Sequence, residues 1–165
     1  MANPSKLYSL CSVLMASLFA YSASVQLNDH DWYFWFPLYA CGCVMNMVNW
    51  AISLRTTTIR HIARLSLLLG IFLFIKVVTE DFVNGIAGFW SLDLSQRVVR
   101  EKTGSGLVVI SLILQLEASL VPEDPLPRKK KEFPKLVEYG MAILVVFGYG
   151  LPFVFFVSQK GEMKF

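Results

Sequence analysis

Charged residues are scarce in this sequence, and their scarcity indicates the class of protein. Asp, Glu, Lys and Arg make up 16% of the 165 residues, whereas 55% are hydrophobic. A soluble domain carries about a quarter charged residues. The apolar residues lie in runs of roughly 20, the helix length that crosses a hydrocarbon layer about 30 Å thick. We therefore predict an all-α integral membrane protein, a bundle of five transmembrane helices forming a single domain over residues 1–165.

Cysteine is also scarce, and motifs that carry chemistry are missing. Cys11, Cys41 and Cys43 all lie within apolar runs, so they do not indicate a disulfide framework. Small buried side chains are the favoured interpretation, and a metal or redox pair at Cys41 and Cys43 is the alternative. The sequence has no nucleophile motif, no His/Asp cluster and no metal-ligand spacing. We expect no cofactor, no metal and no nucleic-acid partner, and we disfavour an enzymatic activity.

Five apolar segments are the predicted spans, at about residues 7–26, 36–54, 62–80, 104–121 and 136–157. A cleaved signal peptide is the alternative interpretation of the first. Residues 91–102 are amphipathic at a helical period, which predicts a short helix lying in the membrane interface before the fourth span. Residues 122–135 form a Pro-rich, basic loop. Small residues recur every four positions in the first span and predict a packing seam: Ser12, Ala16, Ala20 and Ser24.

The most polar stretch separates the first two spans, and we call it the hinge. Its side chains cannot enter hydrocarbon cheaply, so they mark a turn at the membrane surface: Gln26, Asn28, Asp29, His30 and Asp31. The aromatic residues that follow predict an interfacial belt: Trp32, Tyr33, Phe34, Trp35, Phe36 and Tyr39. Pro37 suits the first turn of the second helix, where a missing N–H costs nothing.

Further charged residues are predicted on the hinge side of the membrane, and we call them the charge cluster: Glu80, Asp81, Arg97, Arg100 and Glu101. Salt-bridged caps over the helix ends are the favoured interpretation. The alternative is that the carboxylates gather cations or protons at the mouth of a pathway. The hinge has more polar residues than a turn needs, so we expect the surplus to contact the charge cluster.

Four polar residues are predicted within the spans or near their ends: Asn46, Asn49, Gln115 and Glu117. Hydrogen bonds between helices are the favoured explanation of Asn46 and Asn49, and a stripe lining a solute path is the alternative. For Glu117 near the end of the fourth span, contact with headgroups or a nearby base is favoured over deep burial.

Basic residues are unevenly divided between the two sides of the predicted bundle. Nine of the 15 Lys and Arg residues fall on the side of the N-terminus: Lys6, Arg55, Arg60, Arg64, Arg128, Lys129, Lys130, Lys131 and Lys135. The richer side is expected to be cytoplasmic, which places the N-terminus in the cytoplasm and the C-terminus opposite. The run Arg128, Lys129, Lys130 and Lys131 is predicted to contact anionic lipid headgroups.

Two patches carry a family resemblance. V-Q-L-N-D-H-D at Val25–Asp31 resembles the hinge of the transmembrane protein 220 family, as does L-M-A-S-L-F-A at Leu14–Ala20. Arg100-Glu101 followed by S-G-L-V-V-I at Ser105–Ile110 is similar to that family's approach to a later span, with two additional residues between. The resemblance implies a small eukaryotic multi-pass membrane protein and supplies no activity. It marks Gln26, Asn28, Asp29 and Asp31 as family-motif positions, not catalytic ones.

Three functions remain open at this point. The favoured one is a non-enzymatic membrane protein of unknown molecular activity that acts through contacts with lipids or other membrane proteins. A channel or transporter for cations or protons would need the four intramembrane polar residues to converge on one water-filled space. A membrane-embedded lipid-modifying enzyme would need acids to converge with His30 or His61.

Overall fold

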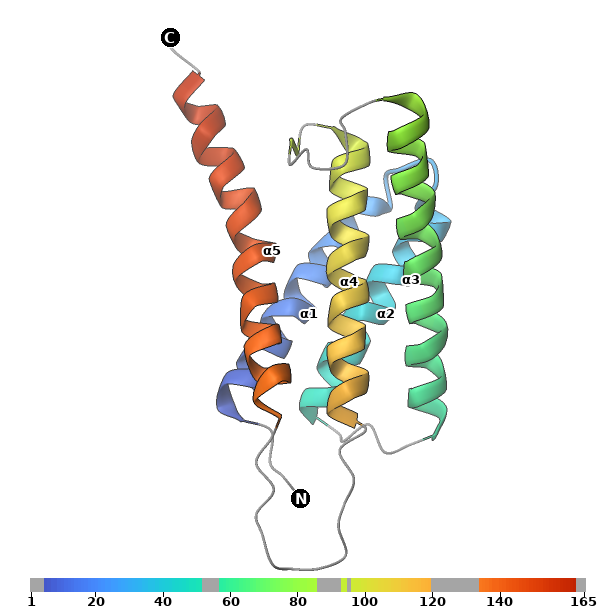
Figure 1. The fold of residues 1–165 in the computed structure, drawn as a ribbon, viewed down its shortest axis with the longest axis vertical. Helices are drawn as coiled ribbons and strands as arrows, with labels where there is room; N and C mark the ends of the chain where they lie inside the picture. Colours follow the sequence, from blue (N-terminus) through green and yellow to red (C-terminus); the bar gives the residue numbers. More distant parts are fainter. Residues whose placement is uncertain (1–4, 52–56, 86–92, 95, 120–133, 163–165) are drawn as a thin grey trace, which may run out of the picture.

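A computed structural model describes residues 5–51, 57–85, 93, 94, 96–119 and 134–162, with the side chains of residues 49–51, 57 and 158–162 left out of the description. The described residues form five helices: α1 (Lys6–Gln26), α2 (Trp32–Ala51), α3 (Thr57–Asn84), α4 (Arg97–Ser119) and α5 (Lys135–Glu162). Successive helices run in opposite directions, so the two chain ends lie at opposite ends of the bundle (Figure 1). The predicted all-α class is confirmed.

Within the described part of the chain, three segments are long and apolar enough to cross a membrane: Lys6–Gln26, Thr58–Asn84 and Lys135–Val157. The fourth helix is more polar, since it begins with Arg97, Arg100, Glu101 and Lys102 and buries serine and glutamine side chains further along. Its position explains this composition, because α4 packs against all four other helices. Polar side chains on such a helix can bond to neighbouring helices instead of facing lipid.

The helix ends follow from local chemistry. The Ser5 hydroxyl caps α1 by accepting a hydrogen bond from the N–H of Tyr8, at 3.1 Å. At the other end of α1 the chain turns through residues 27–31 and enters α2 at Trp32. Gly85 follows α3 with φ +59°, the left-handed conformation that commonly ends a helix and that glycine adopts without strain.

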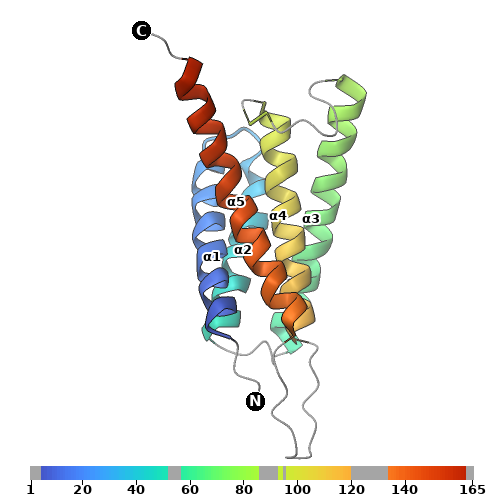
Figure 2. The ribbon, with the colours of Figure 1, turned by 60° about the vertical axis from the view of Figure 1, so that its left-hand side comes forward.

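The fifth helix packs closely over only part of its length. Gly140 lies against Leu114 of α4, and Gly148 lies against Leu18 of α1 and Leu107 of α4. The side chains missing at these glycines let the helices approach. Beyond Gly148 the helix leans away from the bundle (Figures 1 and 2), and nothing lies within 4 Å of a Cβ built at Gly150.

The separate interfacial helix predicted over residues 91–102 is corrected by the structure. Residues 97–102 form the first turns of α4, which continues without a break to Ser119, while residues 91, 92 and 95 lie outside the description. A series of buried positions explains the continuity because it keeps a spacing of three or four residues along the whole helix: Val98, Glu101, Ser105, Val108, Ser111 and Gln115.

Three smaller predictions also change. Pro37 lies inside α2, not in its first turn, because the helix starts at Trp32. The predicted seam on α1 shifts, since Ser12 and Ala16 are buried whereas Ala20 and Ser24 are exposed. Helix α3 starts at Thr57, before the predicted start of the third span at residue 62, so Arg60 and His61 belong to the helix.

Candidate functional site

A network of buried polar side chains joins α1, α2 and α4 inside the bundle. The Tyr8 hydroxyl donates to Oε1 of Gln115 at 2.6 Å, and Nε2 of Gln115 donates to Oδ1 of Asn46 at 2.8 Å and to the Ser12 hydroxyl at 3.5 Å. Nδ2 of Asn46 donates to the Ser111 hydroxyl at 2.9 Å and to the Gly42 carbonyl at 2.8 Å. Each of the five side chains is at most 1% exposed.

The two amide side chains at the centre of this network use their full donor capacity. Each NH₂ group has two N–H bonds to give, and each gives both, while both amide oxygens accept. A polar group buried without a partner is costly, particularly where water cannot reach it. The network is therefore an internally satisfied connection between three helices.

Two of the four predicted intramembrane residues belong to this network. Asn46 and Gln115 meet, whereas Glu117 is exposed and the Asn49 side chain lies outside the description. Helix geometry accounts for Glu117, because residues two apart point to nearly opposite sides of an α-helix.

The hinge meets the charge cluster as expected. Asp31 forms a salt bridge through Oδ1 with the guanidinium of Arg97, and its Oδ2 accepts from the indole N–H of Trp35 at 3.2 Å. Arg97 also donates from Nε to Oε1 of Glu101, one turn further along α4, at 2.6 Å. Arg97 thus links the start of α2 to the start of α4.

A second ion pair joins α3 to α4 at the same end. Nζ of Lys102 lies 2.8 Å from Oδ2 of Asp81, and the two side chains are 9% and 3% exposed. This pair is far more buried than the pair of Arg97, whose side chain is 46% exposed. Removing one member of a buried ion pair leaves an uncompensated charge, so the Asp81–Lys102 contact constrains how α3 sits on α4.

Glu101 has an unusual electrostatic environment. It lies before residue 104, where the predicted fourth span begins, and it is buried. Burial raises the pKa of Glu101, the nearby acids Asp31 and Glu80 raise it further, and the hydrogen bond and charge of Arg97 oppose both effects. The carboxyl group is consequently easier to protonate than an ordinary glutamate.

Tyr39 packs directly against the backbone of α4 beside this cluster. A Cβ atom built at Gly104 would overlap the Tyr39 hydroxyl group and lie 3.0 Å from Cζ of the same ring. The Tyr39 ring also contacts Trp35, with ring centroids 6.4 Å apart, and Phe19, at 6.5 Å. Gly104 therefore allows α2 and α4 to approach closely just inside the charge cluster.

The remaining predicted residues are placed as follows. Asn28, His30 and Glu80 are exposed, Asp29 is half-buried, and Arg100 is exposed and donates to the Leu94 carbonyl at 3.1 Å. Oε1 of Gln26 is buried and has no hydrogen-bond partner among the described residues. The basic run Arg128, Lys129, Lys130 and Lys131 lies outside the description. Across the described residues, no three His, Cys, Asp or Glu side chains gather as a metal site would require.

Several members of these contacts were not predicted as site residues: Tyr8, Ser12, Ser111, Lys102, Trp35 and Tyr39. The sequence does contain a pattern that indicates the buried network. Tyr8 and Ser12 are four apart on one apolar helix, as are Ser111 and Gln115 on another. Polar pairs at that spacing share a helix face.

A helical bundle with three membrane-length apolar helices and buried polar links between helices defines a multi-helix membrane protein. Residues 18–117 match the family model described as "Transmembrane family 220, helix", and the chain belongs to this family. The matched residues include the hinge and the start of α4, so the resemblance of these two patches is confirmed. No curated protein and no solved structure matches the chain.

Proposed function

We propose that this protein is a five-span, non-enzymatic membrane protein that acts through contacts with lipids or with other membrane proteins. In this proposal all five helices cross the bilayer, with the N-terminus in the cytoplasm and the C-terminus opposite. The alternating helix directions support this arrangement, because they place the chain ends at opposite ends of the bundle (Figure 1).

The buried network is the observation that carries the proposal. A pathway for ions or protons through the bundle needs polar groups free to bind a passing solute. The donors of the central amides are instead all occupied: Gln115 donates to Asn46 and Ser12, and Asn46 donates to Gly42 and Ser111, at distances of 2.8–3.5 Å. Their role in this account is to fix the register of α1, α2 and α4.

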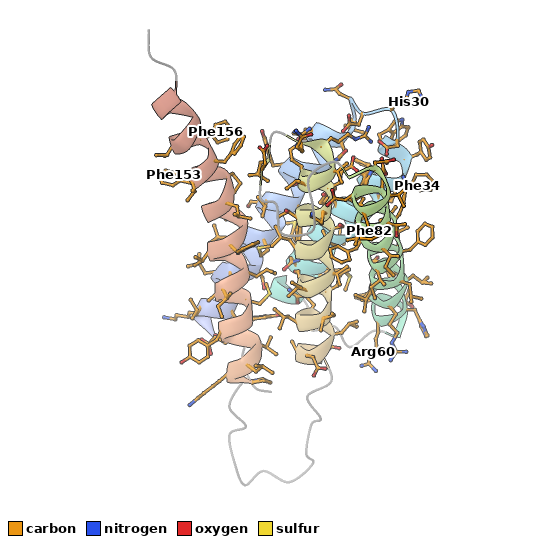
Figure 3. All side chains as sticks on the ribbon, turned by 45° about the horizontal axis from the view of Figure 1, so that its top comes forward. His30, Phe34, Arg60, Phe82, Phe153 and Phe156 are labelled. Carbon is orange, nitrogen blue, oxygen red and sulfur yellow. The ribbon has the colours of Figure 1, made fainter. Side chains whose placement is uncertain are left out.

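The ends of the bundle have different charge. At the end of the bundle where α1, α3 and α5 begin, the exposed bases are Lys6, Arg64 and Lys135. The hinge end carries the acids Asp29, Asp31 and Glu80 together with Arg97 and Arg100. Figure 3 shows Arg60 and His30 toward these opposite ends. A basic cytoplasmic face attracts anionic headgroups, and the run Arg128, Lys129, Lys130 and Lys131 would add to this attraction.

Flux through reconstituted liposomes tests the proposal. Liposomes that contain the full chain, a potassium gradient and a pH-sensitive dye are expected to lose neither gradient faster than protein-free liposomes. Epitope tags at both termini, tested for protease access in sealed membranes, should report opposite sides. Proton or potassium flux that depends on the protein and is changed by Gln115→Leu would refute a contact function.

A further inference from the structure

One lysine on the outer face of α3 lacks a counter-ion in the described chain. Lys76 is exposed, and its Nζ lies 5.8 Å from the centroid of the Phe34 ring on α2. Among the described residues it forms no salt bridge, although Glu80 follows one turn later on α3. Arg97 and Lys102 at the same end are both paired with carboxylates.

The position of this ammonium group defines which anions it can meet. Phe34 lies in the first turn of α2, directly after the hinge, so Nζ of Lys76 lies at the level where α2 begins. Lysine side chains near the end of a span extend toward the interface and keep their charge there. The anions at that depth in a bilayer are the phosphate groups of lipids.

A pair of exposed aromatic rings on α2 lies beside the lysine. The rings of Tyr33 and Phe34 are 4.6 Å apart between centroids, and both side chains are exposed. Exposed aromatic faces attract quaternary ammonium groups electrostatically.

Nearby charge favours a headgroup that also carries a cation. Asp31 at this end is paired with Arg97, but Asp29 and Glu80 form no salt bridge among the described residues and leave the surface acidic. An anionic lipid would be repelled by these carboxylates, whereas a trimethylammonium group would be attracted by them and by the rings. Lys76 for the phosphate and the acidic aromatic surface for the quaternary ammonium together complement one zwitterionic headgroup.

We propose that the outer surface formed by Tyr33, Phe34 and Lys76 binds the phosphocholine headgroup of a membrane lipid. This inference rests on the proposed function, since it requires α2 and α3 to cross the bilayer. It concerns the hinge end of the bundle and a zwitterionic lipid, whereas the basic run is predicted to contact anionic headgroups.

Native mass spectrometry of the full chain purified in detergent tests this site. The protein is titrated with dioleoyl phosphatidylcholine, dioleoyl phosphatidylglycerol or dioleoylglycerol, which has no headgroup phosphate. The unmodified chain should bind phosphatidylcholine most tightly. Lys76→Leu should weaken phosphatidylcholine binding about tenfold, as expected for the loss of one charge-assisted contact. Tyr33→Leu with Phe34→Leu should weaken it about threefold and leave phosphatidylglycerol binding unchanged.

Matched variants control for charge and for aromatic area. Lys6→Leu removes a lysine from the opposite end, and Phe156→Leu removes an exposed ring from α5. Both should bind phosphatidylcholine like the unmodified chain. Lys76→Gln, which keeps the polar chain length, serves if Lys76→Leu does not fold, as judged by helical circular dichroism.

Two results would overturn the site. One is equal binding of phosphatidylcholine and dioleoylglycerol by the unmodified chain. The other is unchanged phosphatidylcholine binding in the Lys76 and aromatic variants, the result expected if this surface takes a protein partner instead. Alkaline extraction separates this failure from failure of the proposed function. A chain that stays in extracted membranes yet shows no headgroup preference refutes the lipid site alone, whereas a chain released by alkali refutes the membrane spans.

Discussion

Tyr8 and Gln115 are 107 residues apart in the chain, and the hydroxyl of the first donates to the side-chain carbonyl of the second at 2.6 Å. This bond ties the start of α1 to the far end of α4. Through Gln115 it continues to Asn46 on α2. This contact shows that the buried polar side chains of different helices satisfy one another's hydrogen-bonding groups.

The Tyr8–Gln115 bond should make a measurable contribution to stability. Tyr8→Phe and Gln115→Leu are each expected to destabilise the bundle, and a double-mutant cycle should give a coupling energy of about 0.6–1.7 kcal/mol, the range for hydrogen bonds between membrane helices. Unfolding of the detergent-solubilised protein by SDS, followed by circular dichroism, measures these energies. Strict additivity of the two changes would show that the bond contributes nothing.

The close approach of Tyr39 to Gly104 predicts a steric effect with a specific rescue. Gly104→Ala should cost about 1–3 kcal/mol, because its methyl group would overlap the Tyr39 hydroxyl. Tyr39→Phe in the same chain removes that oxygen and should recover part of the loss. Gly150→Ala is the matched control, since nothing lies within 4 Å of a Cβ there. Thermal unfolding compares the four proteins, and equal losses at Gly104 and Gly150 would contradict the packing argument.

The buried pair of Asp81 and Lys102 should be more sensitive to single than to double replacement. Asp81→Leu leaves the Lys102 ammonium buried without this carboxylate and is expected to cost about 3–5 kcal/mol. Asp81→Leu combined with Lys102→Leu should cost less than that single change, because neither charge remains buried. Glu80→Leu, at an exposed neighbouring position, should leave the unfolding midpoint nearly unchanged. A double variant less stable than both single variants would contradict this account.

Glu101 should make stability depend on pH. Burial raises its pKa in the folded protein above the ordinary value of 4.5. The folded state therefore binds a proton more readily than the unfolded state, and stability rises as the pH falls from above the raised pKa toward 4.5. The charges of Asp31, Glu80 and Arg97 also act on the Glu101 carboxyl, so these three residues stay unchanged in the variant tested. Glu101→Gln should flatten the pH profile of SDS unfolding in that window; an unchanged profile would assign the dependence to other groups.

Sequence patterns were sufficient to predict the five helices and the contact between the hinge and the charge cluster. Apolar runs located the five helices, and the concentration of polar residues in the hinge predicted its contact with the charge cluster, which the Asp31–Arg97 bridge supplies. These features are readable because each depends on local composition.

The partners within the bundle could not be read from the sequence in the same way. Asn46 and Asn49 share a helix face, yet the bonds of Asn46 described here go to Gly42 in its own helix and to Ser111 and Gln115 on α4. Which face meets which neighbour depends on the packing of α4 against all the other helices. The boundary of α4 was missed for a related reason, since its charged first turns form ion pairs and do not lie apart in the interface.

Accessibility of the buried network to water tests the central claim most directly. In a chain whose three natural cysteines are replaced by alanine, Ser111→Cys places a thiol of similar size in the network, and Asn28→Cys places one on the exposed hinge. A membrane-impermeant maleimide added to both sides of the membrane should label Asn28→Cys and leave Ser111→Cys unmodified. Labelling of Ser111→Cys at a similar rate would show that water reaches the centre of the bundle, and would contradict a closed protein that acts through its surfaces.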